Sequence, residues 1–399
     1  MQDRSTASTP HSADGTALTG ASADELGALL AYVPDRLRRL IDANRLDALV
    51  EIVVDLGRPV QLRFPGDYVL LPHVATVEDL EYVVQRAGAF RADSRTGIDG
   101  TLHRLSAIRN RYRDLVGVTM RVGRHLPGAA WPLRPWLERG DSLLILGAPG
   151  TGKTTLLRDA THILATVLRR RVVVVDTSNE IGGGGNVPHP AIGTARRLQV
   201  PDRAEQYRLL LEAVQNHTPE VIVIDEIGTR QEAEAAATIA ERGVQLLATA
   251  DGRTLANLVR NAALNLLLGG IGTVPLTESM ALLRGVVGAA AGRHTVRERL
   301  QPPPFTVVAE LLNDDLRTIV LYPDAALAVD ALLDGERAEA VCLSARLTPE
   351  FIRQSLAAQQ AEADRAVLAD ASPAPAPDSS PHTDSNTGGG DADAATAQD

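Results

Sequence analysis

The sequence predicts an α/β protein whose main domain is a parallel sheet covered by helices on both faces. Apolar runs alternate with segments of helical spacing: "SLLILG", "RVVVVD", "EVIVID" and "VQLLATA" are the runs. They are almost continuously apolar, as strands buried on both faces are. The first run is followed by a glycine-rich turn and a helical pattern, "GAPGTGKTTLLRDATHIL". Strands that alternate with helical crossovers indicate a parallel sheet.

Composition divides the chain further. Both ends are rich in Ala, Pro, Ser, Asp and Gly and have too few apolar residues to form a core. Between them, a first segment shows helical patterns and short strand-like runs, and a long helix is expected over "TLANLVRNAALNLLLGG" near the end of the main domain. We therefore expect a disordered tail at 1–23, a small α/β domain at 24–124, the main domain with appended strands and helix at 125–345, a helical extension at 346–368 and a disordered acidic tail at 369–399.

Charge and cysteine content exclude several classes. The 399 residues include 40 basic and 50 acidic side chains, a net charge of −10, so no global basic field favours nucleic acid. The one cysteine, Cys342, excludes an intramolecular disulfide and fits a reducing compartment. The start of the chain lacks the apolar segment of a signal peptide, and no uncharged apolar run is long enough to span a bilayer. We expect a soluble, cytoplasmic protein.

The segment "LLILGAPGTGKTT", residues 143–155, fits the phosphate-binding pattern G-x-x-x-x-G-K-[ST]. Lys153 is the only lysine in the chain, although the chain has 40 basic residues. A compact ammonium group reaches the β- and γ-phosphates where a planar guanidinium does not fit. Thr154 is expected to hold Mg²⁺, and Thr155 to reach the α-phosphate. The loop that would surround the phosphates of ATP is Gly147, Ala148, Pro149, Gly150, Thr151 and Gly152.

Carboxylates follow two other predicted strands. In "VIVIDE", Asp225 is expected to organise Mg²⁺ and Glu226 to orient or deprotonate the attacking water. The alternative is a solvated turn at a strand end. In "VVVVDTSNE", Glu180 belongs to a polar cluster at the same edge of the sheet, either as a catalytic residue or as a loop residue that hydrogen-bonds the following glycines. Thr249 could sense the γ-phosphate, and Asp251 is expected to cap the next helix.

Arginine is the residue type that would stabilise the charge of a phosphoryl transition state. No arginine near the loop is well placed in the same chain, so candidates come from "HRLSAIRNRYRD", namely Arg104, Arg109, Arg111 and Arg113. A solvated strand face is the alternative for this pattern. Arg196 and Arg197 are candidates for an intersubunit contact or a central pore. Glycines 182–185 predict a mobile loop or a plain flexible connection, and the histidines show no metal-ligand spacing, so His189 is expected to be structural.

Several long blocks resemble a known family. "LGAPGTGKTTLLRDATHIL", "VVVVDTSNEIGGGGNVPHPAIGTARRLQVP", "EAVQNHTPEVIVIDEIGT" and "AATIAERGVQLLATADG" resemble the stage III sporulation protein AA family and its relatives encoded in cyanobacteria and plastids. The resemblance covers about residues 30 to 340. It implies a RecA/AAA-type P-loop core, similar to the hexameric motor ATPases of type II and IV secretion.

The resemblance also implies roles for residues. Lys153 and Thr154 fall in the Walker A loop, Asp225 and Glu226 in Walker B, and Glu180 in the acidic box. Arginines of the N-terminal domain, Arg104 and Arg109 among them, would complete the site of a neighbouring subunit in a ring. The chain departs from the family at "TADG", where Asp251 replaces a histidine, and it lacks the Arg and His signature of a C-terminal nucleic-acid domain.

These observations together predict a Mg²⁺-dependent ATPase that forms a homo-hexameric ring and acts on a protein partner or a membrane-bound assembly. Two alternatives stay open. One is a RecA-like ATPase on single-stranded nucleic acid, with Arg196, Arg197 and the glycine loop toward a channel. The other is a switch that binds ATP with little turnover, because Asp251 departs from the family pattern.

Overall fold

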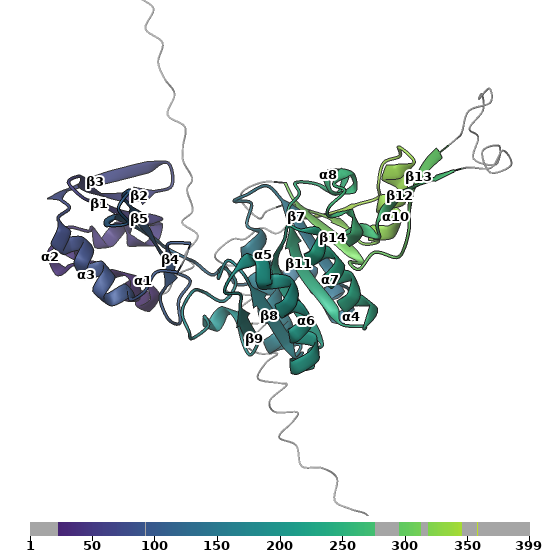
Figure 1. The fold of residues 1–399 in the computed structure, drawn as a ribbon, viewed down its shortest axis with the longest axis horizontal. Helices are drawn as coiled ribbons and strands as arrows, with labels where there is room; N and C mark the ends of the chain where they lie inside the picture. Colours follow the sequence, from purple (N-terminus) through teal and green to yellow (C-terminus); the bar gives the residue numbers. More distant parts are fainter. Residues whose placement is uncertain (1–22, 92, 276–294, 313–317, 345–356, 358–399) are drawn as a thin grey trace, which may run out of the picture.

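The computed structural model describes residues 23–91, 93–275, 295–312, 318–344 and 357. Two bodies lie side by side, each built around its own sheet (Figure 1). We call residues 23–122 the N-terminal module and residues 126–344 the central module, because their buried hydrophobic side chains form separate clusters. The expected tails at 1–23 and 369–399 and the expected helix at 346–368 lie outside the described residues, apart from residues 23 and 357.

The N-terminal module is a six-stranded antiparallel sheet with helices on one face. The strand order is β3-β2-β1-β6-β5-β4. Its strands are β1 (Glu51–Asp55), β2 (Pro59–Phe64), β3 (Asp67–Val74), β4 (Arg95–Gly97), β5 (Arg104–Arg109) and β6 (Leu115–Arg121). Its helices are α1 (Ala23–Leu30), α2 (Asp35–Arg38) and α3 (Val77–Ala87). Alternate strand residues such as Ile52, Leu62 and Met120 pack beneath the helices, as period-two patterning requires.

The central module contains the predicted parallel sheet. The strand order is β16-β15-β14-β7-β11-β10-β8-β9, in which β14 to β9 run parallel and β15 and β16 antiparallel. The strands are β7 (Leu143–Gly147), β8 (Val172–Asp176), β9 (Arg196–Gln199), β10 (Val221–Ile227), β11 (Gln245–Ala250), β14 (Val307–Leu311), β15 (Thr318–Tyr322) and β16 (Val341–Ser344). The hairpin of β12 (Ile271–Pro275) and β13 (Thr295–Arg299) forms a separate two-stranded sheet.

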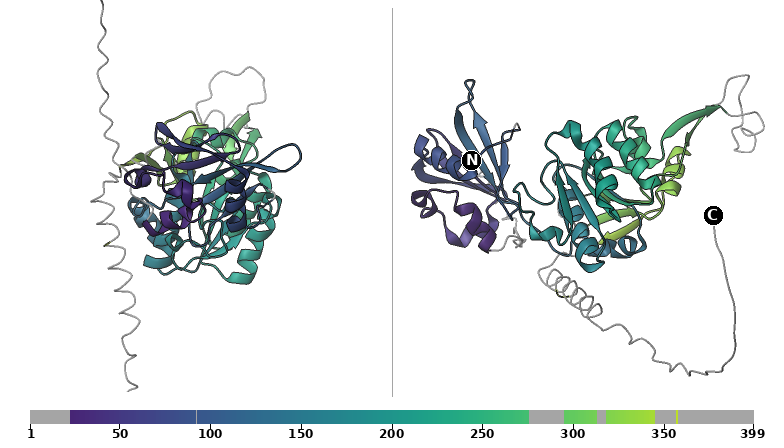
Figure 2. Two further views of the ribbon diagram at one scale, coloured as in Figure 1. Left: turned by 90° about the vertical axis from the view of Figure 1, so that its left-hand side faces the viewer. Right: turned by 60° about the horizontal axis from the view of Figure 1, so that its bottom comes forward.

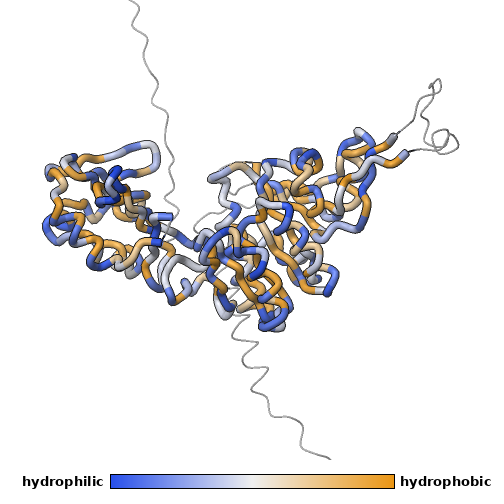
Figure 3. Tube along the Cα trace, viewed as in Figure 1, coloured by the Kyte–Doolittle hydropathy of each residue, from blue (hydrophilic) through white to orange (hydrophobic). Residues whose placement is uncertain are grey.

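Helices cover both faces of the central sheet. They are α4 (Arg134–Arg139), α5 (Lys153–His162), α6 (Gln206–His217), α7 (Arg230–Glu241), α8 (Leu255–Arg260) and α10 (Ala325–Leu333). Two hydrophobic clusters result, one around α5 and one around α6, α7 and α8, with alternate residues of each strand in each cluster. The strands therefore form the most hydrophobic part of the trace (Figure 3).

The expected long helix after residue 254 is wrong in its extent. Helix α8 ends at Arg260, and a short 3₁₀ segment, Asn265–Leu268, follows. Asn261 adopts an extended conformation, and its side chain accepts a hydrogen bond from the Ala263 amide at 3.0 Å. A side chain that bonds nearby backbone in this way competes with the helical pattern.

The two modules meet at the carboxyl ends of the parallel strands. Figure 2 shows them as separate bodies joined by the chain that leaves β6. Within the described residues, no helix is both long enough and apolar enough to cross a membrane.

Candidate functional site

The glycine-rich loop has the geometry of a phosphate-binding loop. It follows β7 and leads directly into α5, so its amide groups lie at a helix N-terminus. Gly150 and Gly152 have φ angles of 87° and 94°, a region that favours glycine. The Lys153 ammonium group donates to the carbonyl of Gly147 at 2.8 Å, across the space that the loop encloses. The sequence therefore placed this loop correctly between a strand and a helix.

Lys153 is surrounded by acidic side chains. Burial lowers its pKa from the usual value, and the charges of Glu226, Asp251 and Glu180 act in the opposite direction. A half-buried ammonium group that faces carboxylates is suited to hold phosphate oxygens.

Asp225 lies at the end of β10 and is 3% exposed. Its carboxylate accepts a hydrogen bond from the Ser178 amide at 2.9 Å. Burial raises its pKa well above the usual value, and the nearby charges of Asp176 and Glu180 act in the same direction. Such a crowded set of carboxylates is stabilised by a cation.

The oxygen donors fit Mg²⁺. The Thr154 hydroxyl and the Asp225 and Glu180 carboxylates, all of which line one cavity, are hard ligands, and Mg²⁺ in nucleotide sites is held by one or two such groups together with phosphates. The described residues contain no cluster of three or more His, Cys, Asp or Glu side chains arranged to hold a metal by themselves. These residues therefore suit a metal that arrives with a nucleotide.

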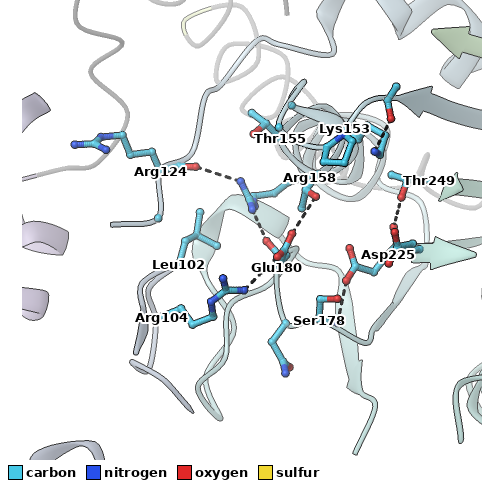
Figure 4. A pocket seen from close by; sticks show the side chains of 18 of the residues that line it. Leu102, Arg104, Arg124, Lys153, Thr155, Arg158, Ser178, Glu180, Asp225 and Thr249 are labelled. Atoms are coloured by element: carbon cyan, nitrogen blue, oxygen red, sulfur yellow. Dashed lines mark hydrogen bonds and ion pairs between the residues drawn. The ribbon is translucent and has the colours of Figure 1, made fainter. Parts of the chain in front are cut away.

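Glu180 connects the two modules. Its carboxylate accepts the Thr154 hydroxyl at 3.3 Å and the Arg104 guanidinium, from β5 of the N-terminal module, also at 3.3 Å (Figure 4). Arg158, on α5 and 6% exposed, donates to the backbone carbonyls of Glu180, Ile181 and Arg124. One carboxylate thus contacts the phosphate loop and the other module at once.

Arg104 reaches the cleft of its own chain, which differs from the expectation that N-terminal arginines act only on a neighbour. Its side chain is 24% exposed, and burial lowers its pKa. The Nε atom is buried and has no hydrogen-bond partner among the residues that the structure describes. The Arg104 side chain itself lines the cleft, where its guanidinium group can contact an anion.

The remaining candidate arginines lie elsewhere. Arg109 is exposed at the far end of β5, where it donates to the carbonyl of Arg113 at 2.9 Å. Arg111 and Arg113 occupy the exposed hairpin that follows. Arg197 lies on β9, a parallel edge strand that the sequence did not predict, and it donates to carbonyls of the glycine loop, including that of Gly182 at 3.0 Å.

Glu226 has two side-chain partners, Arg203 and Asp251, and the sequence did not predict Arg203. Arg203 lies 3.4 Å from its carboxylate, and Asp251 shares a side-chain hydrogen bond with it. Burial raises the pKa of Glu226, and the bond to Asp251 adds to the effect. Arg203 lies more than twenty residues before Glu226, and only the fold brings the two together; no local pattern marks it.

One polar residue of the site differs from expectation, and two others bond to backbone. Asp251 does not cap α8; Thr254 does, by accepting the Asn257 amide, since it directly precedes the helix. The Thr249 hydroxyl donates to the Asp225 carbonyl at 2.6 Å, so it bonds to backbone here. Asp176, which ends β8 in the same polar run as Glu180, is fully buried and accepts the amides of Glu180 and Gly182.

The glycine loop, residues 182–185, is packed between the modules. A Cβ atom on Gly184 would lie 2.8 Å from the Cα atom of Gly97, and one on Gly183 would lie 2.1 Å from the Thr101 carbonyl oxygen. The Gly100 amide donates to the Val187 carbonyl at 3.0 Å. These glycines permit close approach of two backbones, a role that the sequence did not predict.

Histidine residues add a second contact between the modules. His189 is 4% exposed, and its Nε2 atom lies 2.7 Å from the Glu25 carboxylate on α1. Its Nδ1 atom accepts the Ala191 amide at 2.9 Å, so the proton lies on Nε2, which donates to Glu25. The structural role expected for His189 agrees with this geometry.

The cleft between the modules is a cavity of about 650 Å³, within the range of small-molecule sites. Both modules line it, and its basic side chains are Arg104, Arg121, Arg124, Lys153, Arg158 and Arg253. The carboxylates of Glu180, Asp225, Glu226 and Asp251 lie on the side of the central sheet. A cavity with cations on both walls and acids at one side suits a polyanion that carries a divalent metal.

Comparisons with known proteins give relatives along most of the chain. Protein SEEDLING PLASTID DEVELOPMENT 1 of Arabidopsis thaliana is 47% identical to this chain over 79% of it and 45% of its own length. The uncharacterized protein ycf45 of Porphyra purpurea is 44% identical over 79% of this chain and 55% of its own. This chain therefore spans about half the length of these two relatives.

Another relative matches along most of its length. The uncharacterized protein ycf45 of Cyanidium caldarium is 38% identical over 76% of this chain and 88% of its own length. Among solved structures, the ATPase DotB of Legionella pneumophila covers 80% of this chain, with a TM-score of 0.41 and 14% identity over 84% of the DotB chain. The family described as "Sporulation stage III, protein AA" matches residues 94–270. With its parallel-sheet core and glycine-rich loop behind a small α/β module, this chain belongs to the family of the ycf45 proteins and is similar to stage III sporulation protein AA over residues 94–270.

Proposed function

We propose that this chain is a Mg²⁺-dependent ATPase that binds and hydrolyses ATP in the cleft between its two modules. The observation that carries the proposal is the position of Glu180, which contacts the Thr154 hydroxyl of the phosphate loop and Arg104 of the other module. ATP with its metal would enter between these groups. Its phosphates would then replace Glu180 as the partner of Arg104.

The loop from Gly147 to Gly152 holds the phosphates, with the residues Ala148, Pro149, Gly150 and Thr151 between them. Lys153 exchanges its bond to the Gly147 carbonyl for the β- and γ-phosphates, and Thr155, which lines the cavity, contacts the α-phosphate. Thr154 and Asp225 hold Mg²⁺, which supplies neutralisation of phosphate charge when it is bound. Arg104, which lines the cavity, contacts the phosphates with its guanidinium group.

Two carboxylates are suited to act on water. Glu226 and Glu180 line the same cavity from neighbouring strand ends, and each is positioned by an arginine, Arg203 and Arg104 respectively. Either carboxylate can accept a proton from, or orient, a water that attacks the γ-phosphate. We assign Glu226 as the general base. Glu180 is bonded to Arg104, so its position in the site depends on the position of the N-terminal module.

We further propose that the active form is a homo-oligomeric ring, a hexamer, that acts on a protein partner or a membrane-bound assembly in the cytoplasm. Arg109 lies too far along β5 to share the cleft with Arg104, so its contribution would come from a neighbouring subunit. Nucleic acid is the weaker alternative, because Arg197 and the glycine loop are bonded to each other and not directed to a channel.

The test is the steady-state ATPase rate per subunit as a function of protein concentration, with Lys153→Ala as the inactive control. A rate that rises as the protein assembles, that needs Mg²⁺ and that vanishes in the control supports the ring. Arg109→Ala should then lower the rate without lowering ATP affinity. Hydrolysis at full rate by the monomer would refute the ring but not the ATPase.

A second candidate is favoured by the hydrogen bond between Asp251 and Glu226. A general base that shares a proton with a neighbouring carboxyl is a poor base, which suits a switch that binds ATP with little turnover. Tight ATP binding to the wild type, together with hydrolysis no faster than in Lys153→Ala, would support the switch over the motor.

A further inference from the structure

Exposed hydrophobic side chains concentrate on the N-terminal module. Within the described residues, 14 large hydrophobic side chains are exposed, and eight of them belong to this module, which is the smaller of the two. They are Leu40, Leu56, Tyr68, Leu70, Val74, Val77, Ile108 and Tyr112. Clustered exposed apolar side chains mark interaction surfaces, whereas scattered ones need no explanation.

Five of the eight lie at one end of the sheet, on three connected segments: residues 56–58, 74–77 and 108–113. The Gly57 amide donates to the Ala75 carbonyl at 2.9 Å, which joins the first two segments. The Leu56 amide donates to the Val116 carbonyl of β6 at 2.9 Å, and β6 pairs with β5, from which the third segment continues. We call these three segments the distal edge. Tyr112 is 75% exposed, and Val74 and Val77 are more than half exposed.

The distal edge lies away from the nucleotide cleft. In the sheet register, Arg104 pairs with Arg121 at the cleft end, and Arg109 pairs with Leu115 at the opposite end. Five residues of strand separate the two ends of β5, about 16 Å. A partner on the distal edge would therefore leave the cleft open.

Arginines alternate with the apolar side chains there. Arg111 and Arg113 are exposed in the hairpin after Ile108, and Arg58 is exposed in the adjacent turn. The Arg111 guanidinium lies over the Tyr112 ring, 5.8 Å from its centroid. The one acid of the hairpin, Asp114, accepts a hydrogen bond from the Asn110 side chain at 3.1 Å. Arginines outnumber it, so the tip is basic on a chain of net charge −10.

We propose that the distal edge docks on the surface of an anionic lipid bilayer. Basic side chains are attracted to anionic headgroups, and aliphatic side chains and tyrosine insert at the boundary of headgroups and acyl chains. Single-stranded nucleic acid is the less suitable occupant, because binding to it relies on aromatic faces. Four of the five apolar side chains, Leu56, Val74, Val77 and Ile108, are aliphatic. The inference does not depend on ATP hydrolysis.

The test is flotation of the full chain with vesicles of phosphatidylcholine alone, or with about one third phosphatidylglycerol, at roughly 0.1 M and 0.5 M NaCl. We expect flotation with the anionic vesicles only, and less of it at high salt. Arg111→Gln should weaken partitioning about fivefold. The double variant Ile108→Ser, Tyr112→Ser should weaken it about tenfold or more.

Matched controls lie on the central module. Leu327, which is 69% exposed on α10, and Arg242, exposed after α7, can be changed to Ser and Gln respectively. Partitioning that is retained in both controls and lost in the distal-edge variants, all of which melt at the wild-type temperature, supports the proposal. No preference for anionic vesicles, or equal losses in the controls, overturns it. So does an oligonucleotide that binds through Arg111 and Tyr112 while the vesicles do not.

Discussion

Gly97 is the position at which the contact between the modules can be tested most directly. A Cβ atom added to it would lie 2.4 Å from the Cα and 2.6 Å from the carbonyl carbon of Gly184, both of them backbone atoms that cannot rotate away. Gly97→Ala must therefore separate the two segments. Overpacking of this kind costs about 1–3 kcal/mol, so the docking equilibrium should weaken by roughly 5- to 150-fold.

Hydrogen exchange measures this change at single amides. The Gly100 amide donates across the interface to the Val187 carbonyl, whereas the Val122 amide donates to Val50 within the N-terminal module. In Gly97→Ala we expect exchange at Gly100 to accelerate by the factor above and exchange at Val122 to stay unchanged. Gly27→Ala is the control, because a Cβ atom there meets nothing within 4 Å.

Two results would refute the reasoning. Unchanged exchange at Gly100 in Gly97→Ala would mean that the modules do not dock through the glycine loop. Equal acceleration at Gly100 and Val122 would mean that the substitution unfolds the N-terminal module and does not undock it.

Three further predictions concern charge. Arg104→Ala should lower kcat by about 100-fold, as loss of one positioned donor does, with partial recovery in Arg104→Lys; an unchanged kcat would remove Arg104 from the site. Asp251→Asn should raise kcat without changing KM, because Glu226 loses a competing carboxyl group; a fall in kcat would instead show that Asp251 assists turnover. Burial lowers the pKa of His125 to about 3, so the unfolded chain binds a proton below pH 6.5 that the folded chain does not. The free energy of unfolding should fall by about 1.4 kcal/mol from this group between neutral pH and pH 5.5. Denaturant titration of His125→Gln should show a flatter pH dependence, and a slope equal to that of the wild type would contradict the assignment.

The sequence predicts the parts of the site that are local in the chain. Lys153 and Thr154 follow a buried strand and begin a helix, and Asp225 and Glu226 end another strand, so pattern alone places them at one sheet edge. The strands and helix expected to be appended to the main domain are likewise present as β14, β15 and α10, since their apolar runs are short and bounded by turns.

Contacts between distant segments could not be predicted in this way. Strand β9 has only four residues, two of them arginine, and it exists because it pairs with β8. The run of four glycines gives no sign of its partner, which is the backbone around Gly97. Arg203 becomes part of the site only because the turn before α6 lies beside the end of β10. In each case the two partners are too far apart in the sequence for a periodic pattern to predict their contact.

The glycine loop couples the position of the N-terminal module to the contacts inside the cleft. Asp176 fixes the start of the loop by accepting the amides of Glu180 and Gly182, and Arg197 fixes its carbonyls, so the loop is rigid relative to the central sheet. Its outer surface contacts the N-terminal module, and Glu180 lies two residues before it. Any rotation of the N-terminal module must therefore either break the loop contacts or move Arg104 relative to Glu180. The ion pair and the backbone contact are coupled in this way. A ligand that displaces Arg104 from Glu180 therefore also weakens the contact between the N-terminal module and the glycine loop.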